Sequence, residues 1–81
     1  MNAVTVYWDT QDPNNQGWAY RATGEPGDIA SGPIDGVAAD DIYGAIAEAC
    51  HILGLDVTPD SFATDTHTDG GWAVWHEPDV T

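Results

Sequence analysis

Hydrophobic and polar residues alternate along the first part of the chain. The segment 4–8 reads Val-Thr-Val-Tyr-Trp, an alternating run of β-branched and aromatic residues that is typical of a strand. The segment 17–22 alternates in the same way, and residues 12–15 between them have the turn composition Asp-Pro-Asn-Asn. We therefore predict a β-hairpin, followed by a short third strand over residues 29–32 that ends at Pro33.

The period of the pattern changes from about residue 38 onward. Apolar residues then recur with the spacing of one helix face, at Ile42, Ile46, Ala49 and Leu53. We expect a helix over residues 38–53, with Asp40 and Asp41 near its first turn, where the helix dipole favours anions. Gly54 is expected at its C-terminal end, because glycine tolerates the left-handed backbone found there.

A closing hairpin is expected after the helix. The segments 61–66 and 71–76 bracket Asp69-Gly70, a pair that is typical of hairpin turns. The predicted order is β-β-(β)-α-β-β, which indicates an α+β fold: a small antiparallel sheet with one helix packed on one face. Residues 1–81 are expected to form a single acidic domain, whose second sheet face meets solvent or a partner.

The alternation also assigns aromatic residues to the two faces of the sheet. One set is expected to face the core: Val4, Val6, Trp8, Trp18, Tyr20, Trp72 and Val74. Tyr7, Tyr43 or Trp75 would then be exposed, and tyrosine and tryptophan are common anchors of protein interfaces.

The net charge limits the possible partners more than any other feature of the sequence. The chain has 14 acidic residues and a single basic residue, Arg21, which gives a net charge of −13. This balance disfavours binding to nucleic acid or to an anionic membrane and favours a basic protein surface as the partner. Duplex DNA about 30 Å long, the diameter of such a domain, carries roughly 18 phosphates. The carboxylates are therefore dense enough to replace phosphates, and nucleic-acid mimicry is the leading hypothesis.

Another interpretation needs no partner. An acidic surface without lysine also fits adaptation to high salt, where repulsion between carboxylates is screened. A salt-adapted small globular protein therefore stays an alternative.

Catalysis, metals and cofactors are not expected. The segments 12–17 and 65–70 begin like calcium loops, but neither has a glutamate at the twelfth position. The three histidines have no zinc-like spacing, and the single cysteine, Cys50, falls in the apolar helix pattern as a core thiol. No signal peptide or long apolar run is seen, so a cytoplasmic location is expected.

The acidity and the small sheet-plus-helix layout resemble phage-encoded inhibitors of host defence. The nearest group in style is the anti-CRISPR proteins of type I systems, some of which mimic DNA; anti-restriction proteins are a related case. The resemblance covers composition and architecture, and no family motif is matched. It implies a basic nucleic-acid-binding surface of a host protein, such as a CRISPR effector subunit, as the partner in the host cytoplasm.

A second resemblance rests on the order of three segments. Trp18-Ala19-Tyr20, then Ser31-Gly32, then a helix over residues 40–53 is similar to the small antitoxins of the HicB kind. This resemblance implies a toxin as the partner, although the chain lacks an appended DNA-binding segment.

On the mimicry hypothesis, the partner-binding residues are carboxylates on the exposed side of the helix and near it. We predict Asp40, Asp41, Glu48, Asp35, Asp28 and Asp12.

Overall fold

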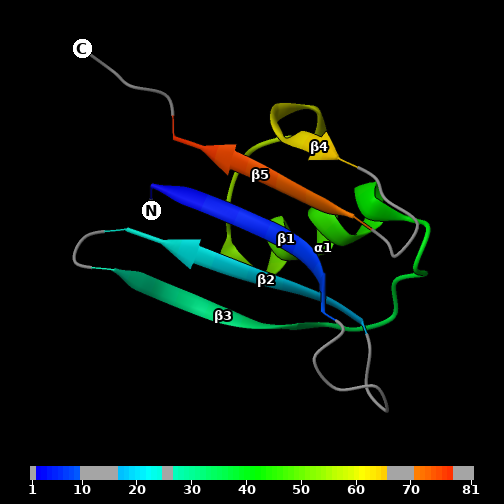
Figure 1. Cartoon of the computed structure of the whole chain (residues 1–81). Helices are drawn as coiled ribbons and strands as arrows, with labels where there is room; N and C mark the ends of the chain where they lie inside the picture. The colour runs from blue at the N-terminus through cyan, green and yellow to red at the C-terminus, as the bar shows by residue number, and fades with distance from the viewer. Residues whose placement is uncertain (1, 10–16, 25–26, 66–70, 78–81) are drawn as a thin grey trace.

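The computed structural model describes residues 2–9, 17–24, 27–65 and 71–77, with only the backbone of residue 28. Its elements in chain order are β1 (Ala3–Asp9), β2 (Gly17–Thr23), β3 (Asp28–Ile34), α1 (Ile42–Leu53), the 3₁₀ helix η1 (Pro59–Ser61), β4 (Ala63–Asp65) and β5 (Trp72–His76). One helix packs on a five-stranded antiparallel sheet (Figure 1), which confirms the predicted α+β class.

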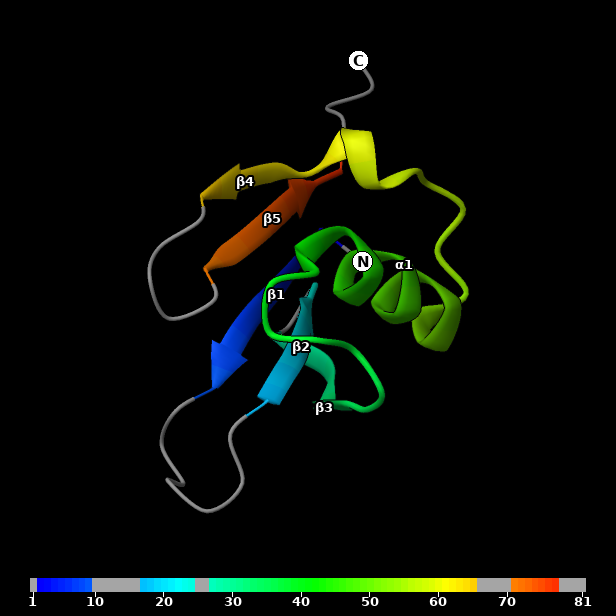
Figure 2. The ribbon, with the colours of Figure 1, turned by 90° about the vertical axis from the view of Figure 1, so that its right-hand side faces the viewer.

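The strands lie in the order β3-β2-β1-β5-β4, so β1 is central. The first three strands form a meander, and α1 then carries the chain past the sheet to its other edge, where β4 begins. The last strand, β5, returns between β4 and β1 and pairs His76 with Ala3. Figure 2 shows α1 on one side of the sheet, and none of the described residues form a helix on the other, so the sheet has a helix side and an open side.

The core lies between the sheet and α1. Register places Val4 opposite both Ala22 of β2 and Trp75 of β5, and all three are buried. The helix contributes its buried face to the same cluster: Ile42, Ala45, Ile46, Ala49 and Cys50. The predicted apolar stripe is thus the face that packs on the sheet, and burial of these side chains is the main driving force for the fold.

The helix begins later than predicted. Asp41 is its N-cap, and the Asp41 carboxylate accepts a hydrogen bond of 3.0 Å from the backbone N–H of Gly44. Residues 38–41 form a turn, in which the Asp41 N–H donates to the Ala38 carbonyl at 3.0 Å. The helix start expected at residue 38 is therefore wrong: Asp40 precedes the helix, and Asp41 caps it, so both lie next to the first turn but not within it.

The helix ends as predicted. Gly54 has a φ of 66°, in the left-handed region, which glycine adopts without the steric cost of a Cβ. Its N–H donates to the His51 carbonyl at 3.3 Å, and the Leu55 N–H donates to the Cys50 carbonyl at 2.9 Å. These two bonds form a Schellman motif, which satisfies carbonyls at the end of the helix.

The face assignment of β5 was predicted incorrectly. Register pairs Val6 with Ala73, so Ala73 and Trp75 face the helix, whereas Trp72 and Val74 lie on the open side. Trp75 is 7% exposed and Trp72 is 40% exposed. The sequence misleads here because the strand is apolar at both alternating positions.

Two strand boundaries also differ from the prediction. The third strand, β3, continues through Pro33 to Ile34, because an edge strand tolerates a proline that cannot donate. The strand expected over residues 61–66 is reduced to β4, because η1 occupies residues up to Ser61. The Asp69-Gly70 turn lies outside the described residues. Within the described ranges, no helix is long and apolar enough to cross a membrane.

Candidate partner-binding surface

Most described carboxylates lie in one part of the molecule. We call residues 35–61 the helix layer: the β3–α1 connection, α1, and the segment through η1. It contains six exposed carboxylates and no lysine or arginine: Asp35, Asp40, Asp41, Glu48, Asp56 and Asp60. The helix layer is therefore the most acidic described surface, and α1 holds it against the sheet.

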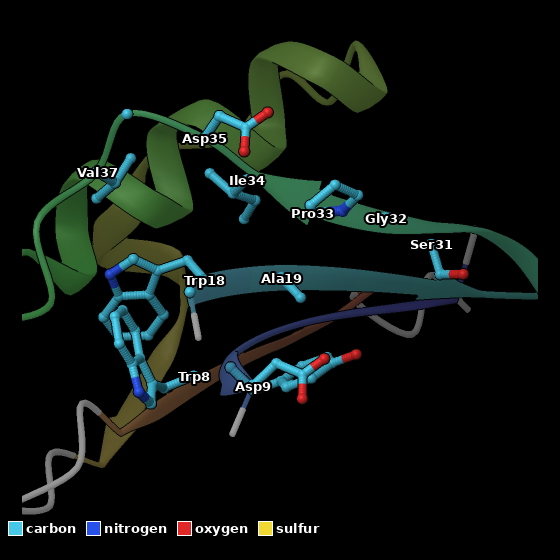
Figure 3. A pocket seen from close by; sticks show the side chains of 13 residues that line it. Trp8, Asp9, Trp18, Ala19, Ser31, Gly32, Pro33, Ile34, Asp35 and Val37 are labelled. Atoms are coloured by element: carbon cyan, nitrogen blue, oxygen red, sulfur yellow. The ribbon is translucent and has the colours of Figure 1, made fainter. Parts of the chain in front are cut away.

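A buried tryptophan positions the β3–α1 connection. Trp18 of β2 is 2% exposed, and its indole N–H donates a hydrogen bond of 2.8 Å to the Ala38 carbonyl. Trp8 packs against it edge-to-face, with ring centroids 5.4 Å apart (Figure 3). The connection that carries Asp35, Asp40 and Asp41 is thus tied to a fixed ring of the core.

Asp41 combines charge with a structural role. Its carboxylate caps the helix, an interaction worth about 1 kcal/mol. A Cβ at position 44 would collide with the Asp41 carboxylate, so glycine is needed there for the cap to keep its geometry. The Asp41 carboxylate is therefore held in one place.

The outer face of α1 is less acidic than predicted. Glu48 lies seven residues after Asp41, which at about 100° per residue puts both on the same side, roughly 10 Å apart along the axis. The other exposed side chains of α1 are not acidic: Tyr43, Ala47, His51 and Ile52. Carboxylates of the helix layer thus come mainly from the connections before and after the helix.

The structure separates the six predicted site residues. Asp35, Asp40, Asp41 and Glu48 are exposed in the helix layer. Asp28 begins β3, whose seven residues span roughly 23 Å, so its backbone lies at the far end of that strand from Asp35. Asp12 lies outside the described residues.

The prediction from the sequence missed two carboxylates of the helix layer. Asp56 and Asp60 are both exposed, and Asp60 belongs to η1, which contacts α1. Their position depends on how the chain returns from the helix to the sheet. The only sequence signal was their acidity, which they share with other loop residues.

The open side of the sheet has a different character. Register aligns one row across all five strands: Pro33, Ala19, Tyr7, Trp72 and Asp65. This row is mostly apolar or aromatic, and the only arginine, Arg21, lies on the same side, opposite Thr5 and Ser31.

A hollow of about 530 Å³ lies at the end of the sheet where β1 ends, β2 begins and β3 ends. Tyr7 and Ala19 line it from the open side, Trp8, Trp18 and Ile34 line it from the helix side, and residues 35–37 line it from the β3–α1 connection. Figure 3 shows Ala19 between Asp35 and Asp9. The hollow therefore borders both sides of the sheet and the helix layer.

Neither a metal site nor a known relative identifies the function. Among the described residues, no group of three or more histidine, cysteine, aspartate or glutamate side chains is placed to hold a metal ion. Comparison of the chain with known protein families, with curated proteins and with solved structures finds no match in any of the three. Functional assignment therefore rests on the residues and their arrangement.

Proposed function

We propose that this domain binds a basic, nucleic-acid-binding surface of another protein and competes with the nucleic acid for it. The specific form that we propose is a DNA-mimicking anti-CRISPR protein that acts on a type I effector. The observation that supports it is the helix layer, with six exposed carboxylates and no lysine or arginine.

Carboxylates of this layer suit a groove built for phosphates. Charge-assisted hydrogen bonds from arginine and lysine form with carboxylates as they do with phosphates. Asp41 and Glu48 lie on the same side of α1, roughly 10 Å apart along the axis, so one basic groove can contact both. Because the cap holds Asp41 in place, less side-chain entropy is lost when a partner binds it.

Competition with DNA tests the proposal directly. A purified type I effector is loaded with labelled target DNA, and the domain is titrated at about 0.1 M and about 1 M salt. We expect DNA to be displaced at the lower salt and much less at the higher, because attraction between exposed charges is screened. Undiminished DNA binding at saturating domain would refute the proposal.

Two double variants locate the binding surface. Asp40→Asn with Glu48→Gln removes two charges from the helix layer without touching the cap. Asp65→Asn with Glu77→Gln removes two charges elsewhere and is the matched control. We expect about a tenfold loss of affinity for the first pair and less than about twofold for the second. Equal losses would contradict a binding surface in the helix layer.

Other outcomes support the alternatives. Thermal melts across a range of ionic strengths test salt adaptation. A domain that is folded only at molar salt would support it. A tight complex with a small basic toxin, without any effect on CRISPR interference, supports an antitoxin role.

A further inference from the structure

We propose that the hollow between β1, β2, β3 and residues 35–37 receives one arginine side chain of the basic partner. This inference rests on the proposed function, because it names the group that the partner inserts. It adds a shaped site to a surface otherwise defined by charge.

The hollow extends around the end of the sheet and is lined from both of its sides. Ala19 of β2 is paired with Tyr7 of β1 and with Pro33 of β3, and these three residues line it from the open side. Trp8, Trp18 and Ile34 line it from the helix side. The volume of about 530 Å³ lies within the range of small-molecule sites, roughly 300–1,000 Å³.

The lining favours a flat cation. Tyr7 contributes an aromatic ring, on which a guanidinium group stacks favourably. Asp9 and Asp35 lie on opposite sides of Ala19 in Figure 3, and none of the described lining residues is basic. An anion would be repelled by these carboxylates and by the net charge of −13.

Arginine fits this lining better than lysine. Its guanidinium is planar, is more weakly hydrated than an ammonium, and presents five donors, so it can contact a ring face and a carboxylate together. The Ser31 hydroxyl at the hollow provides a further acceptor.

The hollow and the helix layer are continuous. Asp35 belongs to the helix layer and also lines the hollow. A partner that docks on residues 35–41 is therefore next to the hollow, and one protruding arginine reaches it. The partner's remaining basic residues then face Asp40, Asp41 and Glu48.

Small probes test the hollow without the partner. N-acetyl-arginine amide, its neutral citrulline analogue and the lysine analogue are titrated into the whole domain at low salt, and backbone NMR shifts are followed. For the arginine probe we expect saturable shifts centred on Ala19, Ser31 and Gly32. The lysine probe should bind at least about fivefold more weakly, and the citrulline probe should not bind. Equal binding of citrulline, or shifts centred on the helix layer, overturns the inference.

Single substitutions test which lining residues bind the arginine probe. Asp9→Asn should weaken arginine binding about fivefold, whereas Asp65→Asn, at the other edge of the open side, should weaken it less than about twofold. Tyr7→Leu keeps an apolar side chain but removes the ring, and should also weaken binding. Thermal melts check that each variant is folded. Unchanged arginine binding in both Asp9→Asn and Tyr7→Leu contradicts the inference.

The effector assay separates the two proposals. If the domain fails to displace DNA but binds the arginine probe in the hollow, the proposed function and the partner's insertion fail together, while the arginine site itself remains. If it displaces DNA and Asp9→Asn competes as well as the wild type, the arginine insertion fails while the proposed function stands.

Discussion

The helix layer and the strands differ in charge although they are similar in length. The helix layer spans 27 residues (35–61) and has six carboxylates without lysine or arginine. The five strands together contain 29 residues, with three carboxylates and Arg21, which leaves two net negative charges. Low strand propensity of aspartate explains part of this contrast. The absence of lysine and arginine is not particular to the helix layer, because Arg21 is the only residue of either type in the chain.

This small domain tolerates strong acidity better in its exposed connections than in its strands. Like charges directly opposite each other on neighbouring strands are destabilising, whereas carboxylates in exposed connections remain hydrated. The sheet and the buried face of α1 provide stability, and the helix layer carries the charge.

The largest effect is expected from the two tryptophans of β5. Trp75→Ala should lower the free energy of unfolding by about 3–5 kcal/mol, because it removes a buried ring from the core. Trp72→Ala should lower it by about 1 kcal/mol or less, because Trp72 lies on the open side. Urea unfolding followed by circular dichroism measures both. Equal losses would mean that the two sides of the sheet contribute alike.

An intermediate effect is expected where the two regions are joined. Trp18→Phe keeps an aromatic ring but removes the N–H that donates to the Ala38 carbonyl. It should lower the free energy of unfolding by about 1–2 kcal/mol. Faster hydrogen exchange of the Asp41 N–H, which bonds the same carbonyl, should accompany this loss. Trp8→Phe is the control, and similar exchange at Asp41 in both variants would contradict the anchoring role.

A smaller effect is expected at the helix cap. Asp41→Ala should lower the free energy of unfolding by about 1 kcal/mol, whereas Asp41→Asn should lower it little, because asparagine also caps helices. Both variants remove the same charge. Equal losses of partner affinity would identify charge as the contribution of Asp41, and a loss confined to Asp41→Ala would identify the cap.

The smallest effect on stability is expected from deprotonation of the Cys50 thiol, which lies on the buried side of α1. Burial raises the pKa of the Cys50 thiol above its ordinary value of 9.0. The native state therefore keeps the proton longer than the unfolded chain, so this contribution to stability is complete below pH 9 and is lost as pH rises further. Thiol labelling near pH 8 should be at least about tenfold slower in the native state than in urea. Equal rates would show that the helix layer separates readily from the sheet.

Local patterns predicted most of the fold. Alternation identified the first hairpin, helical spacing identified the buried face of α1, and Gly54 marked the end of the helix. The start of α1 was missed because Ala38 and Ala39 are good helix formers locally, whereas Trp18, distant in sequence, binds the Ala38 carbonyl. Tertiary contacts thus override local propensity at this boundary.

The candidate surface was harder to predict than the fold. Asp28 and Asp35 are close in sequence, yet the length of β3 separates their backbone positions. Asp56 and Asp60 join the helix layer because η1 packs near α1, which no local pattern shows. The side of the sheet taken by Trp72 and Trp75 depends on pairing with β1, and alternation alone does not decide it.

The central position of β1 has a consequence for the order of folding. Its partner β5 lies near the other end of the sequence, and Ala3 pairs with His76. Closing this long loop has an entropic cost that local hairpins avoid, so the meander of β1, β2 and β3 is expected to form before β5 pairs with β1. Until β5 pairs, β1 has an unpaired edge, which is the kind of surface that starts aggregation. Loss of β5, by truncation or by a proline at Ala73, should therefore convert a stable domain into an aggregating one.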